Sequence, residues 1–221
     1  MNQDYSNAIA FILEGATEKV FYLNMLKHFC GRHPDWEFSR NVDAGNGEIN
    51  YVVQTPNSSV LIRMYVVGTI TNMTKAHSWF SNRCKAVYRG HKWTVFLCYD
   101  TDNYMGEITK FYEGDWYELR KQLKKGQRTT IIDLASSADI EDTMLLDSDG
   151  VFRFLGIEPM PIPGGSKGKI KMKKIFRTKG PGSAYHEGER AKPLIEALDL
   201  NKIISLSPIP FLEIEQALAD E

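Results

Sequence analysis

The sequence predicts an α/β protein whose mostly parallel, four-stranded sheet is flanked by helices and followed by a C-terminal helical appendage. Three observations predict it: short apolar runs, helical patterns between them, and Gly or Pro residues near several junctions. The apolar runs lie at 8–13, 60–68, 93–99 and 129–134. They are nearly continuous rather than alternating, which is typical of strands buried on both faces of a parallel sheet.

The segments between these runs repeat apolar residues at the spacing of a helix face. Residues 16–30 place Tyr22, Leu26 and Phe29 on one such face, and Gly31 follows the pattern. This face can pack on the sheet. Further helices are expected at 75–88, 115–125, 140–146, 187–198 and 210–220.

Two parts of the chain differ in composition. Residues 1–157 carry the alternating strands and helices, with an insert at about 32–58 that is rich in Gly and Asn and is expected to be mostly loop. Residues 158–221 begin with Pro and Gly residues, continue as a basic segment and end in two expected helices. Because no long linker separates the parts, we expect the second to pack on the first as an appendage.

The bulk composition is that of an ordinary soluble protein. The 221 residues are 43% hydrophobic and 25% charged, with a net charge of −1, so a nucleic-acid surface would have to be local. Cys30, Cys84 and Cys98 are widely spaced and form no CxxC pair, which fits a reducing compartment. The N-terminal apolar run is too short for a signal peptide or a membrane span. We therefore expect a cytoplasmic protein without a membrane partner.

Acidic residues follow three of the expected strands. Glu14 comes directly after the first, Asp100 and Asp102 after the third, and Glu141 shortly after the fourth. The carboxyl ends of parallel strands line the binding crevice of such sheets, and carboxylates crowded there need a cation. Magnesium or manganese suits them, because both are hard cations that bind carboxylate oxygens. An extended backbone would place Asp100 and Asp102 on the same side.

Each acidic motif is weak by itself. An Asp-x-Asp pair occurs by chance in many chains, and one acid after a strand often caps the next helix. Glu18, a further candidate ligand in the first helical turn, would also interact favourably with the helix dipole alone. The combination of strand, Glu-Gly-x-Thr-Glu, helix, later strand and Asp-x-Asp is much more specific than its parts.

This combination resembles the Toprim fold, a Rossmannoid α/β fold. The residues that carry the resemblance are Glu14-Gly15-Ala16-Thr17-Glu18 and Asp100-Thr101-Asp102, together with Ile140-Glu141-Asp142. The chain is most similar to OLD-like nucleases and small phage-defence-associated Toprim proteins. The resemblance implies a magnesium-dependent nuclease. No G-x-x-x-x-G-K-[ST] motif is present, so any ATPase would have to be a separate partner subunit.

A basic segment lies between residues 159 and 186, which include seven Lys or Arg residues and no acid. Beside a magnesium site this segment predicts nucleic-acid binding, since phosphate backbones attract such patches. Its Gly-rich flanks suggest mobility. A solvated helix face or an acidic protein partner are the alternatives. Similarity to OLD-like nucleases suggests Lys167 or Lys173 as catalytic. The seven residues are Lys167, Lys169, Lys171, Lys173, Lys174, Arg177 and Lys179.

The expected function is that of a metal-dependent endonuclease or phosphodiesterase acting on DNA or RNA, including tRNA, as the toxic effector of a bacterial anti-phage defence system. Asp100 and Asp102 would hold metal, Glu14 would hold a second metal or act as general base, and Glu141 would complete the shell. Two alternatives remain open: a catalytically silent or ATPase-gated Toprim subunit, and a magnesium-dependent nucleotidyl or phosphoryl transferase. Homo-oligomerisation is also open.

Overall fold

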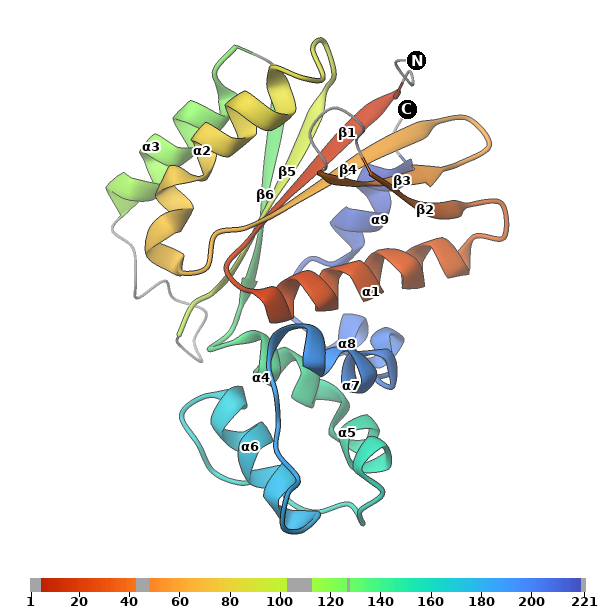
Figure 1. The fold of residues 1–221 in the computed structure, drawn as a ribbon, viewed down its shortest axis with the longest axis vertical. Coiled ribbons are helices and arrows are strands. Elements are labelled where there is room, and N and C mark those ends of the chain that lie inside the picture. Colours follow the sequence, from red (N-terminus) through yellow and green to blue (C-terminus); the bar gives the residue numbers. More distant parts are fainter. Residues whose placement is uncertain (1–4, 43–47, 103–112, 127, 220–221) are drawn as a thin grey trace.

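The computed structural model describes residues 5–42, 48–102, 113–126 and 128–219, which form a mixed α/β fold (Figure 1). Its six-stranded sheet, flanked by helices, has the order β2-β3-β4-β1-β5-β6. The central β1 is parallel to β4 and β5, and β5 is parallel to β6, whereas β2, β3 and β4 are joined antiparallel. The strands are β1 (Asn7–Leu13), β2 (Glu37–Val42), β3 (Ile49–Gln54), β4 (Ser59–Val66), β5 (Trp93–Asp100) and β6 (Thr129–Ser136).

The four strands expected from the sequence are the parallel half of this sheet, but the expected number of strands is wrong. β2 and β3 lie within the segment that was expected to be a loop-like insert, and they pair as an antiparallel hairpin that extends the sheet beyond β4. The continuous apolar stretch of β3, residues 51–53, is only three residues long; it pairs with β4 and is buried. The Gly- and Asn-rich residues 43–47 of the expected insert lie outside the described residues.

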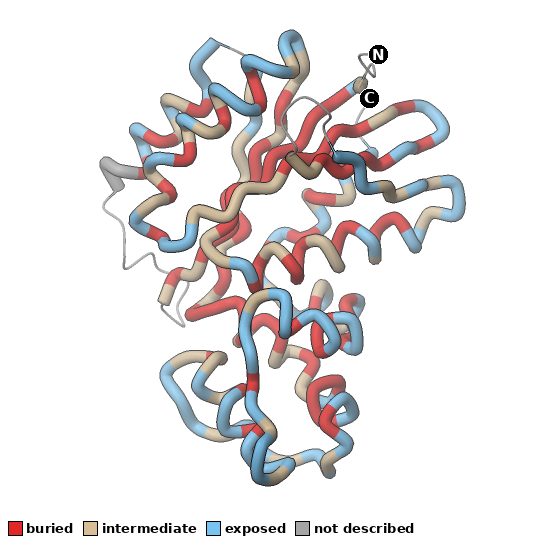
Figure 2. The backbone as a smooth tube through the Cα atoms, viewed as in Figure 1, coloured by how far each residue is buried: buried red, intermediate tan, exposed pale blue. Residues whose placement is uncertain are grey.

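Alternate residues of β1 enter two apolar cores on opposite faces of the sheet. On one face the ring of Phe11 stacks on Phe96 with centroids 4.9 Å apart and lies 5.8 Å from Tyr22 of α1. On the other face Trp93 meets Phe80 edge-on at 5.3 Å. Figure 2 shows the resulting band of buried backbone through the centre of the sheet. Burial on both faces accounts for the continuous apolar pattern of this strand.

Short helical segments cover one face of the sheet (Figure 1). The single helix expected at 75–88 is replaced by 3₁₀, α and π turns. The π turn contains Lys85. The Nζ of Lys85 donates hydrogen bonds to the carbonyls of Leu123 and Lys125 at 2.5 and 2.9 Å, so these carbonyls at the C-terminal end of α3 have a partner. These segments are η1 (Ile70–Lys75), α2 (Ala76–Trp79), the π-helical η2 (Phe80–Lys85) and α3 (Glu113–Lys124).

The other face is covered by α1 (Ala16–Arg32) and α9 (Leu212–Ala219). Phe21 and Phe211 meet at a centroid distance of 5.9 Å, so the C-terminal part of the chain shares a core with the N-terminal part. The remaining helices lie below the carboxyl ends of the parallel strands (Figure 1). They are α4 (Ile140–Met144), η3 (Leu145–Asp147), α5 (Ser148–Leu155), α6 (Gly168–Thr178), η4 (Gly188–Ala191), α7 (Lys192–Glu196) and α8 (Leu200–Leu206).

The described helices include none with the length and apolar character needed to cross a membrane.

Candidate metal centre

A polar crevice of about 560 Å³ opens where the carboxyl ends of β1, β5 and β6 meet the first turns of α1 and α4. In an open parallel sheet this is the edge where ligands bind. The sequence-predicted acids Glu14, Glu18, Asp100, Asp102 and Glu141 all line this crevice, although 127 positions separate the first from the last. Parallel pairing is what brings them together. Asp139, Glu187, Lys167 and Lys169 also line it.

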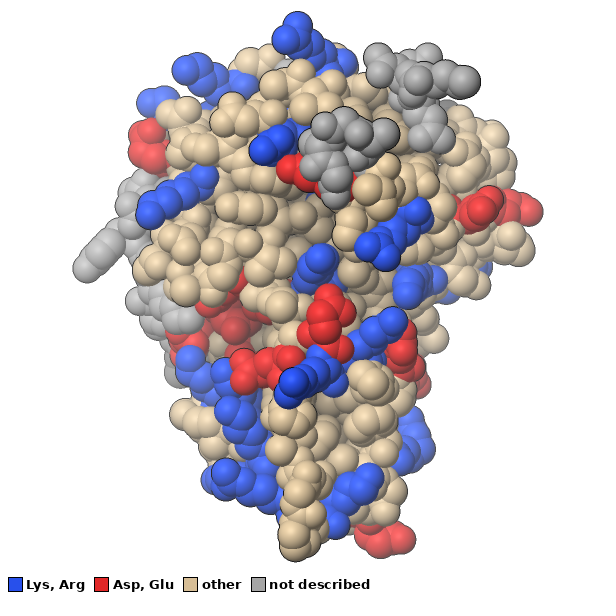
Figure 3. All heavy atoms as spheres, in the orientation of Figure 1, with Lys and Arg blue, Asp and Glu red and all other residues tan. Residues whose placement is uncertain are grey.

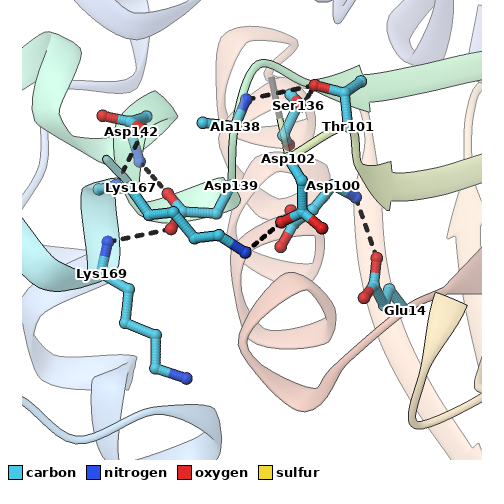
Figure 4. Close-up of polar contacts among 11 residues, drawn as sticks. Glu14, Asp100, Thr101, Asp102, Ser136, Ala138, Asp139, Asp142, Lys167 and Lys169 are labelled. Atoms are coloured by element: carbon cyan, nitrogen blue, oxygen red, sulfur yellow. Dashed lines mark hydrogen bonds and ion pairs between the residues drawn. The ribbon is translucent and has the colours of Figure 1, made fainter. Parts of the chain in front are cut away.

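Three of these carboxylates converge. One oxygen each of Glu14, Glu18 and Asp100 lies within 4.8 Å of the other two. Glu14 follows β1, and its Oε2 accepts a hydrogen bond of 3.1 Å from the backbone N–H of Asp100 at the end of β5 (Figure 4). Glu18 is only 5% exposed and folds back toward Gly15, where an added Cβ would lie 2.7 Å from its Oε2. Gly15 therefore leaves the space that the Glu18 carboxylate occupies.

The convergence is electrostatically costly without a cation. Burial, reinforced by the neighbouring carboxylates, raises the pKa of Asp100 to about 9 and the pKa of Glu18 to about 7. Asp100 Oδ1 is buried and accepts no hydrogen bond from any described residue. An all-oxygen set with a buried, unsatisfied acceptor fits a hard divalent cation such as magnesium or manganese.

Asp102 is placed differently from what an extended Asp-x-Asp would give. Its φ of 57° lies in the left-handed region, so the chain turns at this point and the same-side expectation for Asp100 and Asp102 does not follow from strand geometry. The Asp102 carboxylate forms an ion pair with Lys167 at the rim of the crevice (Figure 4). Asp102 is thus a rim residue and lies outside the group of three converging carboxylates.

A second left-handed turn lies beside the one at Asp102, just after the end of the neighbouring strand β6. Ala138, which is fully buried, also has a φ of 57°, and its carbonyl accepts from the backbone N–H of Asp102 at 2.9 Å. The hydroxyl of Thr101 donates to the carbonyl of Ser136 at 2.9 Å and accepts from the N–H of Ala138 at 3.3 Å. These bonds join the ends of β5 and β6 and hold two residues in a sparsely populated conformation, which is common at functional sites.

A second group of acids lies on the α4 side of the crevice. Burial raises the pKa of Glu141 to about 7, and its Oε1 accepts a 2.8 Å hydrogen bond from the hydroxyl of Tyr185. Asp139 caps α4 by accepting from the N–H of Asp142 at 2.9 Å, and burial raises its pKa. The candidate site residues from the sequence did not include Asp139 or Tyr185. The Asp-x-x-Asp capping pattern was a signal for the first; nothing local marks the second.

Residues 168–178 of the basic segment form α6, whereas the mobility that its Gly-rich flanks suggested stays a prediction. Its apolar residues Met172, Ile175 and Phe176 are buried against the core, and this amphipathic pattern is what forms α6. The start of α6 docks on α4: the N–H groups of Gly168 and Lys169 donate to Asp142 and Asp139 at 2.8 and 3.0 Å (Figure 4). A Cβ at position 168 would collide with the backbone of α4.

The seven basic side chains have different surroundings. Lys167 and Lys169 line the crevice, whereas Lys173 does not, so the structure separates the two lysines that were considered as catalytic. Several others are engaged within the molecule. Lys171 forms an ion pair with Asp142 at 2.6 Å, and Lys174 donates to the carbonyl of Gly164. Glu187 pairs with both Lys169 and Lys173, at 2.6 and 3.9 Å. Arg177 and Lys179 are exposed.

Comparisons with known proteins give no family. No family model matches the chain, and no curated protein matches it. Among solved structures, it resembles a 5'-methylthioadenosine/S-adenosyl homocysteine nucleosidase of Campylobacter jejuni, with 11% identity, 96% of this chain and 98% of that chain covered, and a TM-score of 0.29. It also resembles a futalosine hydrolase mutant of Helicobacter pylori strain 26695, with 8% identity, coverage of 98% and 96%, and a TM-score of 0.26.

By these comparisons the prediction of a metal-dependent nuclease is wrong. The two solved structures are named as a nucleosidase and a futalosine hydrolase, and neither is a nuclease or a Toprim protein. With TM-scores below 0.5, they do not assign their own activities to this chain. The Toprim resemblance and the separate ATPase partner stay predictions from the sequence, and the chemistry of the crevice has to be argued from its own residues.

Proposed function

We propose that the crevice binds a divalent cation, magnesium or manganese, through Glu14, Glu18 and Asp100, and that the chain is an enzyme that uses this cation to hydrolyse a small anionic substrate. The observation that carries the proposal is the buried Asp100 Oδ1, which accepts no hydrogen bond from the part of the chain that the structure describes and lies beside two further carboxylates. A stable fold rarely leaves such an acceptor without a partner, and a cation would supply one.

Other residues of the crevice would supply proton transfer and substrate attraction. When bound, the cation would supply positive charge that stabilises anionic oxygen and acidifies water. Glu141 lines the same crevice with a pKa of about 7, close to the value that suits a group exchanging protons near neutrality. The Tyr185 hydroxyl orients this carboxylate. Lys167 and Lys169 line the crevice with ammonium groups that would attract an anionic substrate group.

A cation-binding measurement tests the first half of the proposal. Manganese titrated into the parent protein, followed by calorimetry and by the electron paramagnetic resonance signal of free manganese, should saturate at the crevice. Asp100→Asn should weaken binding at least about 100-fold, since it removes one anionic ligand and leaves the cation under-coordinated. Asp35→Asn, at an exposed position away from the crevice, is the matched control and should bind as the parent does. Absence of saturable binding to the parent would overturn the cation site.

A turnover measurement tests the second half separately. The cation-loaded parent is assayed against a panel of small esters, amides and glycosides that carry a phosphate or carboxylate group. We expect hydrolysis that disappears both on chelation and in Asp100→Asn, while Asp35→Asn keeps it. If the parent binds manganese but hydrolyses none of the panel, the cation site stands and the enzyme assignment fails.

A further inference from the structure

A second hollow, separate from the crevice, lies between α1 and the β2–β3 hairpin. This α1–hairpin cleft encloses about 420 Å³, within the size range of sites for small organic ligands. Lys19, Leu23 and Lys27 line it from α1, and Phe38, Arg40 and Tyr51 line it from the hairpin. Figure 3 shows Lys and Arg side chains on the face of the molecule that contains these elements.

The regular geometry of both elements places these residues opposite one another. Lys19, Leu23 and Lys27 recur at intervals of four and therefore follow one stripe of the helix. On the hairpin, Phe38 and Arg40 are two residues apart on β2, and Arg40 is the cross-strand partner of Tyr51 on β3. Two regular elements thus form facing walls of the cleft, and η4 and α7 contribute further lining residues.

The charge of the α1–hairpin cleft is mainly positive. Lys19, Lys27 and Arg40 form no ion pair with any other described residue within 4.0 Å. Two acids also line the cleft, but Glu196 already pairs with Lys192 at 3.7 Å. Glu189 remains as a single acceptor opposite three cations. Such a distribution favours an anion that also carries a hydroxyl group.

The floor of the cleft is aromatic and apolar. The rings of Phe38 and Tyr51 stack at a centroid distance of 5.6 Å and an interplanar angle of 17°, and Leu23 and Ile49 extend the apolar surface. Phe38 is only partly buried, so part of its ring stays accessible. A planar ring system can lie against such a surface, because stacking on an aromatic side chain does not depend on ring identity.

We propose that the α1–hairpin cleft binds a nucleoside phosphate, with its base against Phe38, its ribose hydroxyls near Glu189 and its phosphates between Lys19, Lys27 and Arg40. The volume accommodates one nucleotide. A long nucleic-acid strand fits less well, because it would have to pass Glu189 and Glu196 at the α7 side. The proposal is independent of the cation site, since none of these residues lines the crevice.

Calorimetric titration in the presence of a chelator tests this site without a contribution from the crevice. The ligands are AMP, ADP, ATP, adenosine and inorganic tripolyphosphate. We expect ADP or ATP to bind at least about tenfold more tightly than either adenosine or tripolyphosphate, since only the nucleotides satisfy both the aromatic floor and the cations. Failure of every nucleotide to bind would overturn the proposal, and so would tripolyphosphate binding as tightly as ATP.

Substitutions of the lining residues test whether the nucleotide binds in the α1–hairpin cleft. Lys27→Ala combined with Arg40→Ala should lower nucleotide affinity at least about tenfold, because two charge-assisted contacts are removed from exposed positions that the core does not need. Arg177→Ala combined with Lys179→Ala removes the same number of charges from the exposed end of α6 and is the matched control. Phe38→Leu should weaken ADP binding while leaving the weak binding of tripolyphosphate unchanged. Equal losses in the double variant and its control would place the nucleotide elsewhere.

Discussion

The crevice and the α1–hairpin cleft are two hollows of comparable size, about 560 and 420 Å³, with opposite charge. Adjacent residues supply both: Glu18 lines the crevice and Lys19 the cleft, and Gly188 and Glu189 divide in the same way. In the crevice all the carboxylates except that of Glu187 are buried or half-buried, and those of Glu14 and Asp139 accept hydrogen bonds from backbone N–H groups. In the cleft the positively charged groups lie at the ends of long, more exposed side chains. The crevice therefore depends on backbone placement, whereas the cleft depends on side-chain type.

The substitution with the largest expected effect on one site and not the other is Gly168→Ala. The added Cβ would collide with the backbone of α4 at Glu141 and Asp142, so α6 would be pushed away from the crevice. We expect a loss of about 1–3 kcal/mol in the free energy of unfolding, measured in urea, and weaker manganese binding. Nucleotide binding in the cleft should be unchanged.

Gly164→Ala is the control for this substitution, because a Cβ there meets no atom within 4 Å. It should leave both sites and the stability as in the parent. If Gly168→Ala weakened the cleft as much as the crevice, the two hollows would not be structurally independent.

The second test is the pH dependence of thermal stability. The pKa of Glu18 rises from 4.5 to about 7 and that of Asp100 from 3.8 to about 9, chiefly through burial. Between the lower and the upper values the folded protein holds more protons than the unfolded chain, so stability falls as pH rises. A cation replaces these protons, and its stabilising effect should therefore grow with pH.

The measurement is the melting temperature with chelator and with saturating magnesium. We expect the difference between the two to be larger at about pH 8 than at about pH 5.5, by at least about 2–4 °C, which corresponds to roughly 1 kcal/mol in a chain of this size. Asp100→Asn should flatten the dependence. A stabilisation by magnesium that is the same at both pH values would contradict the electrostatic account of the crevice.

The smallest test concerns Tyr185, whose hydroxyl donates to Glu141 at 2.8 Å. Tyr185→Phe should cost about 1 kcal/mol in the free energy of unfolding and raise the pKa of Glu141 further, since the lost bond favours the charged carboxylate. Urea unfolding as a function of pH measures both effects. Tyr117→Phe, at a side chain that is 64% exposed, is the control. Identical losses in the two variants would mean that Tyr185 does not orient Glu141.

The parallel half of the fold and the three converging carboxylates were accessible to sequence reasoning for the same reason. Strands buried on both faces leave continuous apolar runs, and Glu14 and Asp100 stand at their ends. The hairpin was missed because β3 offers only a short apolar stretch beside Gly and Asn residues. Tyr185 reaches Glu141 across 44 positions and leaves no local pattern. The pairing of Lys167 with Asp102 likewise depends on the docking of α6, which the residue order does not reveal.

The strand order also implies a sequence of events during folding. β2, β3 and β4 are neighbours in the chain as well as in the sheet, so their loops close at little entropic cost. β1 must wait for partners that lie far along the chain, since Ala8 pairs with both Leu61 and Trp93. Long-range pairing of this kind is slow. The hairpin side of the cleft is therefore expected to form early, whereas the bond between Glu14 and Asp100 spans 86 positions and reports that β1 and β5 have paired.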